Sequence, residues 1–103
     1  MSLKKQFLKS KPVCKVTFSL TKEEVNEAKK VILLGDFNNW NIKEGVVLKK
    51  LKDGSFKVAI DLETEKEYQF KYLLDGGNWV NDAEADKYVG NGMGAEENSV
   101  VIV

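Results

Sequence analysis

Apolar and polar residues alternate along much of this chain with a period of two, the pattern of strands that bury one face. In residues 13–20, for example, Cys14, Val16 and Phe18 share one face, while lysine, threonine and serine occupy the other. Residues 31–34 are apolar on both faces, which predicts a central strand covered on both sides. Further strands are predicted over residues 46–51, 55–62, 68–74 and 99–103, with a short one around Trp79 and Val80.

Turn and cap signals separate these predicted strands. Asp53 and Gly54 lie between two apolar runs, a combination that predicts a β-hairpin. Thr21 and Glu24 have the spacing of a capping box and predict a short helical connector over residues 21–28. Residues 82–97 form the longest predicted loop, and loops of this length in compact domains are usually functional or mobile.

Together these segments predict an all-β fold, namely an immunoglobulin-like antiparallel β-sandwich of about seven strands. The sandwich is expected to occupy residues 13–103 as a single domain. Residues 1–12 are predicted to form a flexible N-terminal arm or a short helical turn.

Composition narrows the classes of partner. The chain has 103 residues, of which 43% are hydrophobic and 31% charged, as in an ordinary globular domain. Sixteen lysines balance sixteen acidic residues and there is no arginine, which argues against binding to nucleic acid or to an anionic membrane. Cys14 is the single cysteine, and no apolar stretch approaches the roughly 20 residues of a membrane span. We therefore expect a cytoplasmic protein.

The residues that most often carry catalysis are missing or poorly placed. There is no histidine, and Cys14 lies on an apolar strand face without a base to activate it. The Gly-x-Gly-x-Gly segment at residues 90–94 does not open a helix after a strand, so it is typical of a loop rather than a phosphate cradle. Asp36, Asp75 and Asp82 leave open a glycosidase with paired carboxylates, although turn chemistry explains loop aspartates better. We expect no catalytic residue, metal or cofactor.

The two tryptophans carry the strongest functional signal. Trp40 and Trp79 each follow an apolar strand and stand in segments rich in asparagine, aspartate and glycine, where full burial is difficult. Lys71 projects from the strand face opposite to Phe70 and Tyr72. If the two indole rings and the lysine share a face, they match the C–H faces and the hydroxyl rim of a pyranose. A tryptophan in a small sandwich is more often partly core, and the residues alone leave both interpretations open.

Three motifs occur in one order and spacing: GDFNNW at residues 35–40, YQFKY at residues 68–72 with a following Asp-Gly turn and Trp79, and NSVV at residues 98–101. In this arrangement they resemble the family-48 carbohydrate-binding module. That family includes the glycogen-binding domain of the AMP-activated protein kinase β subunit and the N-terminal domains of isoamylases and glucan branching enzymes. The resemblance covers residues 13–103.

The resemblance implies an immunoglobulin-like (early-set) sandwich that binds α-1,4-linked glucans such as glycogen, starch or maltodextrin without catalysis. Trp40 and Trp79 match the family's two sugar-stacking tryptophans. Lys71 matches the lysine that hydrogen-bonds sugar hydroxyls, and Asn98 the asparagine beside the final strand. The alternative is a structural or protein-interaction domain that docks a glucan-metabolising enzyme or a kinase subunit without binding sugar.

Two departures from the family pattern concern the expected site. The turn that leads to Trp79 is one residue longer than in the kinase subunit, a difference that bears on the orientation of this ring. The glycine-rich segment before Asn98 corresponds to the one that lies over the sugar. It carries Gly94, Glu96 and Glu97 where the kinase subunit has a leucine and a threonine, so we expect a weaker hydrophobic cover.

Overall fold

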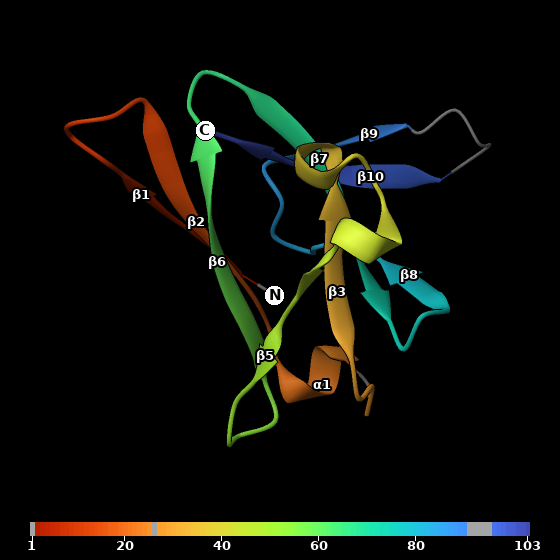
Figure 1. Ribbon diagram of the computed structural model, residues 1–103. Helices are drawn as coiled ribbons and strands as arrows, with labels where there is room; N and C mark the ends of the chain where they lie inside the picture. Colours follow the sequence, from red (N-terminus) through yellow and green to blue (C-terminus); the bar gives the residue numbers. More distant parts are fainter. Residues whose placement is uncertain (1, 26, 91–95) are drawn as a thin grey trace.

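The computed structural model describes residues 2–25, 27–90 and 96–103, and these fold into two antiparallel β-sheets that pack face to face (Figure 1). The four-stranded sheet has the order β1-β2-β6-β5. The six-stranded sheet has the order β4-β3-β7-β10-β9, with β8 also paired to β7. The strands are β1 Ser2–Phe7, β2 Val13–Leu20, β3 Val31–Gly35, β4 Val46–Val47, β5 Lys49–Lys50, β6 Phe56–Glu63, β7 Glu67–Leu74, β8 Asn78–Val80, β9 Lys87–Gly90 and β10 Glu97–Ile102. The predicted immunoglobulin-like β-sandwich is confirmed.

The core lies between the two sheets and follows from the alternation within each strand. Every second residue of β2 from Cys14 to Leu20 is buried, and these side chains face the inward residues of β3, β7 and β10. Phe18 meets Phe70 edge to face, with ring centroids 5.1 Å apart. Each large side chain buried in this way contributes roughly 1.5–3 kcal/mol of hydrophobic stabilisation. Cys14 is buried and free, as its position on the apolar face predicted.

Short helices join some of the strands: α1 is Lys22–Val25, η1 is Asp36–Asn38 and η2 is Ile42–Glu44. The predicted capping box of α1 is present, because the Thr21 N–H donates to Glu24 Oε1 at 2.8 Å and the Glu24 N–H donates to Thr21 Oγ1 at 3.2 Å. Within the part of the chain that the structure describes, no helix has the length and apolar character that a membrane span requires.

The first strand differs from the prediction of a flexible arm or a helical turn over residues 1–12. Ser2–Phe7 forms β1, which pairs along its whole length with β2 at the edge of the four-stranded sheet. Leu3 packs against the core, and Lys5 spans to the other sheet, where its ammonium group lies 2.6 Å from Asp86. A lysine on the inward face breaks the apolar alternation, and this is why the strand was not predicted.

Two further segments are more structured than predicted. The expected loop over residues 82–97 contains β9, which pairs with β10 at the edge of the six-stranded sheet. The expected strand over residues 46–51 is divided between the sheets, because β4 pairs with β3 while β5 pairs with β6. The hairpin at Asp53 and Gly54 is confirmed, and Gly54 has the positive φ of 89° that favours glycine.

Strand β7 occupies the middle of the six-stranded sheet and positions most of the functional side chains. One edge of β7 pairs with β3. Its other edge pairs with β10 up to Phe70 and with β8 from Tyr72 onward. Lys71 therefore stands where the partner of β7 changes from β10 to β8.

Candidate functional site

A second, smaller apolar cluster lies on the outer face of the six-stranded sheet, the face that points away from the four-stranded sheet. Its buried members are Ile32 and Leu34 of β3 and Leu73 of β7, and Trp40 packs against them. Ile32 pairs with Leu73 in register, and paired residues of antiparallel strands share a face. This cluster explains why every residue of β3 is buried, as its apolar sequence predicted. The Trp40 side chain is thus partly buried, as one interpretation held, and partly exposed to solvent.

The segment from Gly35 to Trp40 returns the chain over this outer face. Gly35 lies so close to β7 that a Cβ atom would collide with the Gln69 carbonyl oxygen. The buried Asn38 amide accepts from the Gly35 N–H at 3.0 Å and donates to the Leu33 carbonyl at 3.1 Å. Trp40 has a φ of 58°, and its N–H donates to the Gly35 carbonyl at 3.0 Å. A bulky residue with positive φ is uncommon and persists only where its surroundings hold it.

Trp79 reaches the same face from the β7–β8 hairpin. It pairs with Leu73 in register, so its side chain projects to the outer face, where it is 43% exposed. The Trp40 and Trp79 ring centroids are 6.4 Å apart, and the ring planes are inclined at 50°. The longer turn before Trp79 therefore leaves its ring beside Trp40, and both tryptophans contribute to one aromatic surface.

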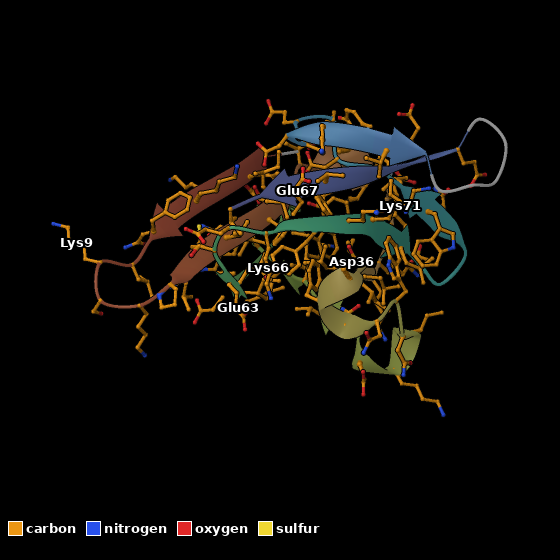
Figure 2. All side chains as sticks on the ribbon, turned by 90° about the horizontal axis from the view of Figure 1, so that it is seen from above. Lys9, Asp36, Glu63, Lys66, Glu67 and Lys71 are labelled. Carbon is orange, nitrogen blue, oxygen red and sulfur yellow. The ribbon has the colours of Figure 1, made fainter. Side chains whose placement is uncertain are left out.

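Lys71 projects from the same face, between the two aromatic elements. It pairs with Leu34 in register and is half-buried. Within residues 2–25, 27–90 and 96–103, its side chain has no hydrogen bond or ion pair. In Figure 2 the ion-paired Glu63 and Lys66 lie near the start of β7, and Asp36 and Lys71 lie farther along the strand. The Lys71 ammonium group is therefore available to a ligand.

Asn98 completes the predicted set. It precedes the fully buried Ser99 on β10, so strand alternation places Asn98 on the outer face. Its amide donates to Gln69 Oε1 at 3.0 Å. The glycine-rich segment expected to cover a ligand falls mainly on residues 91–95, which lie outside the described residues. The four predicted side chains thus share one face of one sheet.

Asp36 and Gln69 join these side chains but were not predicted to belong to the site. Asp36 Oδ1 accepts from Trp40 Nε1 at 3.1 Å, and Asp36 Oδ2 accepts from the Gln69 N–H at 2.8 Å. Two signals could have identified them. Gln69 lies two residues from Lys71 on the same strand, which places both on one face, and Asp36 is the polar residue at the turn that carries Trp40.

A buried polar network anchors β8 and its following loop to β10. Asp82 is fully buried, and its Oδ2 accepts from the Tyr72 hydroxyl at 2.8 Å. Its backbone N–H donates to Ser99 Oγ at 2.8 Å, while Asn81 Oδ1 accepts from the Ser99 N–H at 3.0 Å. Burial raises the pKa of Asp82, and burial together with the neighbouring Asp82 carboxylate raises the pKa of Tyr72 far above its usual range.

The three aspartates that left a glycosidase open each have a structural contact. Asp36 bridges Trp40 to β7, as described above, and Asp82 lies in the buried network. Asp75 Oδ1 accepts from two consecutive backbone N–H groups, those of Lys29 and Lys30, at 2.9 Å each. These contacts favour the interpretation as turn and anchoring residues. Among the described residues, no group of three or more histidine, cysteine, aspartate or glutamate side chains could hold a metal ion.

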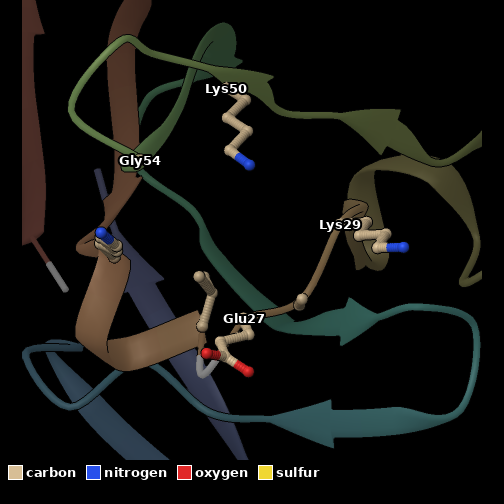
Figure 3. A pocket seen from close by; sticks show the side chains of 7 residues that line it. Glu27, Lys29, Lys50 and Gly54 are labelled. Atoms are coloured by element: carbon tan, nitrogen blue, oxygen red, sulfur yellow. The ribbon is translucent and has the colours of Figure 1, made fainter.

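A separate pocket of about 240 Å³ lies at the end of the sandwich that carries α1 (Figure 3). Its lining comes from α1, the connector after it and the β5–β6 hairpin: Lys22, Val25, Glu27, Ala28, Lys29, Lys50 and Gly54. The labelled Lys29 side chain points away from the pocket in this view. None of the predicted site residues lines it. The candidate site is therefore separate from this pocket, and its four side chains, Trp40, Lys71, Trp79 and Asn98, are called the platform below.

Two inclined indole rings on one face of an immunoglobulin-like sandwich, with an ammonium group and an amide beside them, define a carbohydrate-binding module. Comparison with protein families agrees with this class. A family model described as the glycogen recognition site of AMP-activated protein kinase matches residues 16–103, so the chain belongs to this family. A search of the curated proteins found no match.

Proposed function

We propose that this chain is a non-catalytic module that binds α-1,4-linked glucan on the outer face of the six-stranded sheet, through Trp40, Lys71, Trp79 and Asn98. The observation that carries this proposal is the pair of indole rings with centroids 6.4 Å apart. The C–H faces of a pyranose stack on such rings, and its hydroxyls can bond to an ammonium group and an amide. Membership of a glycogen recognition family supports the same ligand class.

The inclination of the rings supports an α-linked chain. Two planes that meet at 50° form a bent platform. Successive sugars of an α-1,4-glucan are tilted relative to each other because the chain coils. A β-1,4-glucan is an extended ribbon with flat faces. The bent platform therefore fits the coiled chain better than the ribbon.

The few groups that the site offers to a sugar support weak, reversible attachment without catalysis. One stacking contact contributes on the order of 1 kcal/mol beyond area burial, by analogy with aromatic pairs. Two such contacts and a few hydrogen bonds correspond to a Kd roughly between micromolar and millimolar. With no histidine in the chain and its loop aspartates held by backbone groups and side chains, the site would hold a polymer rather than cleave it.

Titration calorimetry with maltoheptaose on the wild type and on Trp79→Ala tests this function. We expect saturable binding to the wild type and at least about a tenfold loss in the variant, because an exposed stacking ring is removed. Phe7→Ala is the matched control, since Phe7 is an exposed aromatic residue on the other sheet, and it should bind like the wild type.

Cellohexaose serves as the linkage control in the same titration. Equal binding of both sugars would remove the α-1,4 assignment. No saturable response of the wild type to maltoheptaose, in heat or in tryptophan fluorescence, would overturn the proposed function.

A specific observation favours the alternative of a protein-docking domain. Ile42 and Val47 are each 55% exposed, and Val47 pairs with Ile32, which extends the apolar surface beside Trp40. An enzyme or kinase subunit that covered this surface would use aromatic anchors in the same way. A wild type that is folded but silent toward maltoheptaose would favour this alternative. The cytoplasmic location stays a prediction.

A further inference from the structure

A continuous hydrogen-bonded chain links the first and the last of the four platform residues. It begins at Trp40 Nε1, which donates to Asp36 Oδ1 at 3.1 Å. Asp36 Oδ2 accepts from the Gln69 N–H at 2.8 Å, and Gln69 Oε1 accepts from Asn98 Nδ2 at 3.0 Å. The chain crosses from η1 through β7 to β10, so it joins three elements that are far apart in the sequence.

We propose that Asp36 and Gln69 are positioning residues: Asp36 sets the orientation of the Trp40 ring, and Gln69 sets the orientation of the Asn98 amide. The consequence for sugar binding rests on the proposed function, whereas the consequence for ring geometry does not.

Asp36 is suited to this role because both of its oxygens are engaged by protein donors. Packing against Ile32, Leu34 and Leu73 limits how deep Trp40 can lie, but an apolar contact is non-directional and leaves the ring free to rotate about its side-chain bonds. The bond to Nε1 supplies the missing direction. It also helps to hold Trp40 at its unfavourable φ of 58°.

Gln69 is suited to its role because the Asn98 amide has nearly the same shape in its two flipped orientations, so a hydrogen-bond partner is needed to fix one of them. A hydrogen bond from Asn98 Nδ2 to Gln69 Oε1 distinguishes the two ends of the Asn98 amide. The Asn98 carbonyl oxygen then points away from Gln69 and can accept a hydrogen bond from a sugar hydroxyl. Without Gln69 Oε1, both amide orientations become populated and the ligand must select one of them.

Circular dichroism without any sugar tests the role of Asp36. Two indole rings with centroids 6.4 Å apart and planes inclined at 50° couple their electronic transitions and give a paired positive and negative band in the far ultraviolet. Trp40→Phe and Trp79→Phe should each abolish this couplet, which assigns it to the pair. Asp36→Ala should reduce its amplitude by about half or more, because the ring loses its directional bond.

Asp61→Ala is the matched control, because Asp61 is an exposed aspartate on the outward face of the four-stranded sheet, and it should leave the couplet unchanged. A couplet of wild-type size in a folded Asp36→Ala variant would overturn the role of Asp36. A wild type without a couplet would overturn the ring geometry on which that role depends.

Maltoheptaose titration tests the role of Gln69. Gln69→Leu removes the acceptor at similar size, and affinity should fall about fivefold, the effect of one unfixed hydrogen bond. Gln69→Glu keeps an acceptor oxygen for Asn98 Nδ2 and should restore affinity to within about twofold. In Asn98→Ala, Gln69→Leu should have no further effect, because its only target has been removed.

Equal affinity of Gln69→Leu and the wild type, or an undiminished loss in the Asn98→Ala background, would overturn the role of Gln69. A wild type that does not bind maltoheptaose would overturn the proposed function and, with it, the ligand role of Asn98. The circular dichroism result would still decide the role of Asp36, so the two failures are distinguishable.

Discussion

The two outer faces of this sandwich are built from strands of the same alternating kind and yet carry opposite surfaces. On the four-stranded sheet, the outward side chains of β2 and β6 are small or polar and largely open to solvent: Lys15, Thr17, Lys57, Ala59 and Asp61. On the six-stranded sheet, the outward Ile32, Leu34 and Leu73 are buried under Trp40. The difference arises because the connection after β3 folds back over one sheet only. The outer face of the six-stranded sheet can carry a binding surface because the connection after β3 covers part of it with Trp40.

The largest change in stability is expected for a substitution at Gly35, where the connection leaves β3. Gly35→Ala would place a Cβ atom against the Gln69 carbonyl oxygen and 2.9 Å from the Phe70 Cβ. Because both neighbours belong to a central strand, we expect the free energy of unfolding to fall by about 2–3 kcal/mol. Urea unfolding measures it. The control is Gly77→Ala, which meets no atom within 4 Å and should change stability by less than about 0.5 kcal/mol. Similar losses in the two variants would contradict the close approach.

The next largest effect distinguishes the contributions of the two tryptophans to the free energy of unfolding. Trp40→Ala removes the cover of the outer apolar cluster and should cost about 2 kcal/mol of unfolding free energy, below the range for fully buried aromatic residues because the side chain is only partly buried. Trp79→Ala should cost less than about 1 kcal/mol, since its ring is 43% exposed. Both variants should lose maltoheptaose binding. A Trp79→Ala variant that is the less stable of the two would reverse this assignment.

A smaller effect compares two lysines on opposite outer faces. Lys71→Ala should weaken maltoheptaose binding by about 1 kcal/mol, or about fivefold, through loss of a charge-assisted hydrogen bond to a hydroxyl. Lys57→Ala removes the same charge from the four-stranded sheet and should leave the affinity unchanged. Equal losses would mean that net charge, rather than the position of Lys71, governs binding.

The smallest expected effect is a pH dependence of the free energy of unfolding, and it arises from the buried Asp82. Burial raises the pKa of Asp82, so the folded protein keeps this proton at pH values where the unfolded chain has released it. The stability contributed by the proton is complete below the ordinary aspartate pKa and is lost as pH rises through the folded pKa. Wild-type stability relative to Asp82→Asn, measured by urea unfolding, should therefore decline over the interval of pH that begins at the ordinary aspartate pKa of about 4 and extends upward. A relative stability that rises over this interval would contradict the direction of the pKa shift.

The parts of the fold that were predictable are those with two apolar faces or a clear alternation. β2, β3, β6 and β7 could be predicted because burial dictates their side chains, whereas β1 and β9 are edge strands in which polar residues such as Lys5 and Lys87 are tolerated. The contact between the two tryptophan rings could not be derived from spacing, because it depends on the backbone of two turns. Alternation places Gln69 on the face of Lys71, but its hydrogen bond with Asn98 depends on the register between β7 and β10, which alternation alone does not specify.

The two faces of strand β7 have different tasks. Its even-numbered residues pack in the core, while Lys71 and Leu73 belong to the outer face that carries the candidate site. A slip of one position in its pairing would move the aromatic core residues to the surface and the lysine into the interior at the same moment. A form misaligned by one position therefore cannot retain the ligand surface. Retention on an immobilised glucan would then separate molecules with the correct strand register from molecules with a shifted one. The same experiment would report on correct folding as well as on affinity.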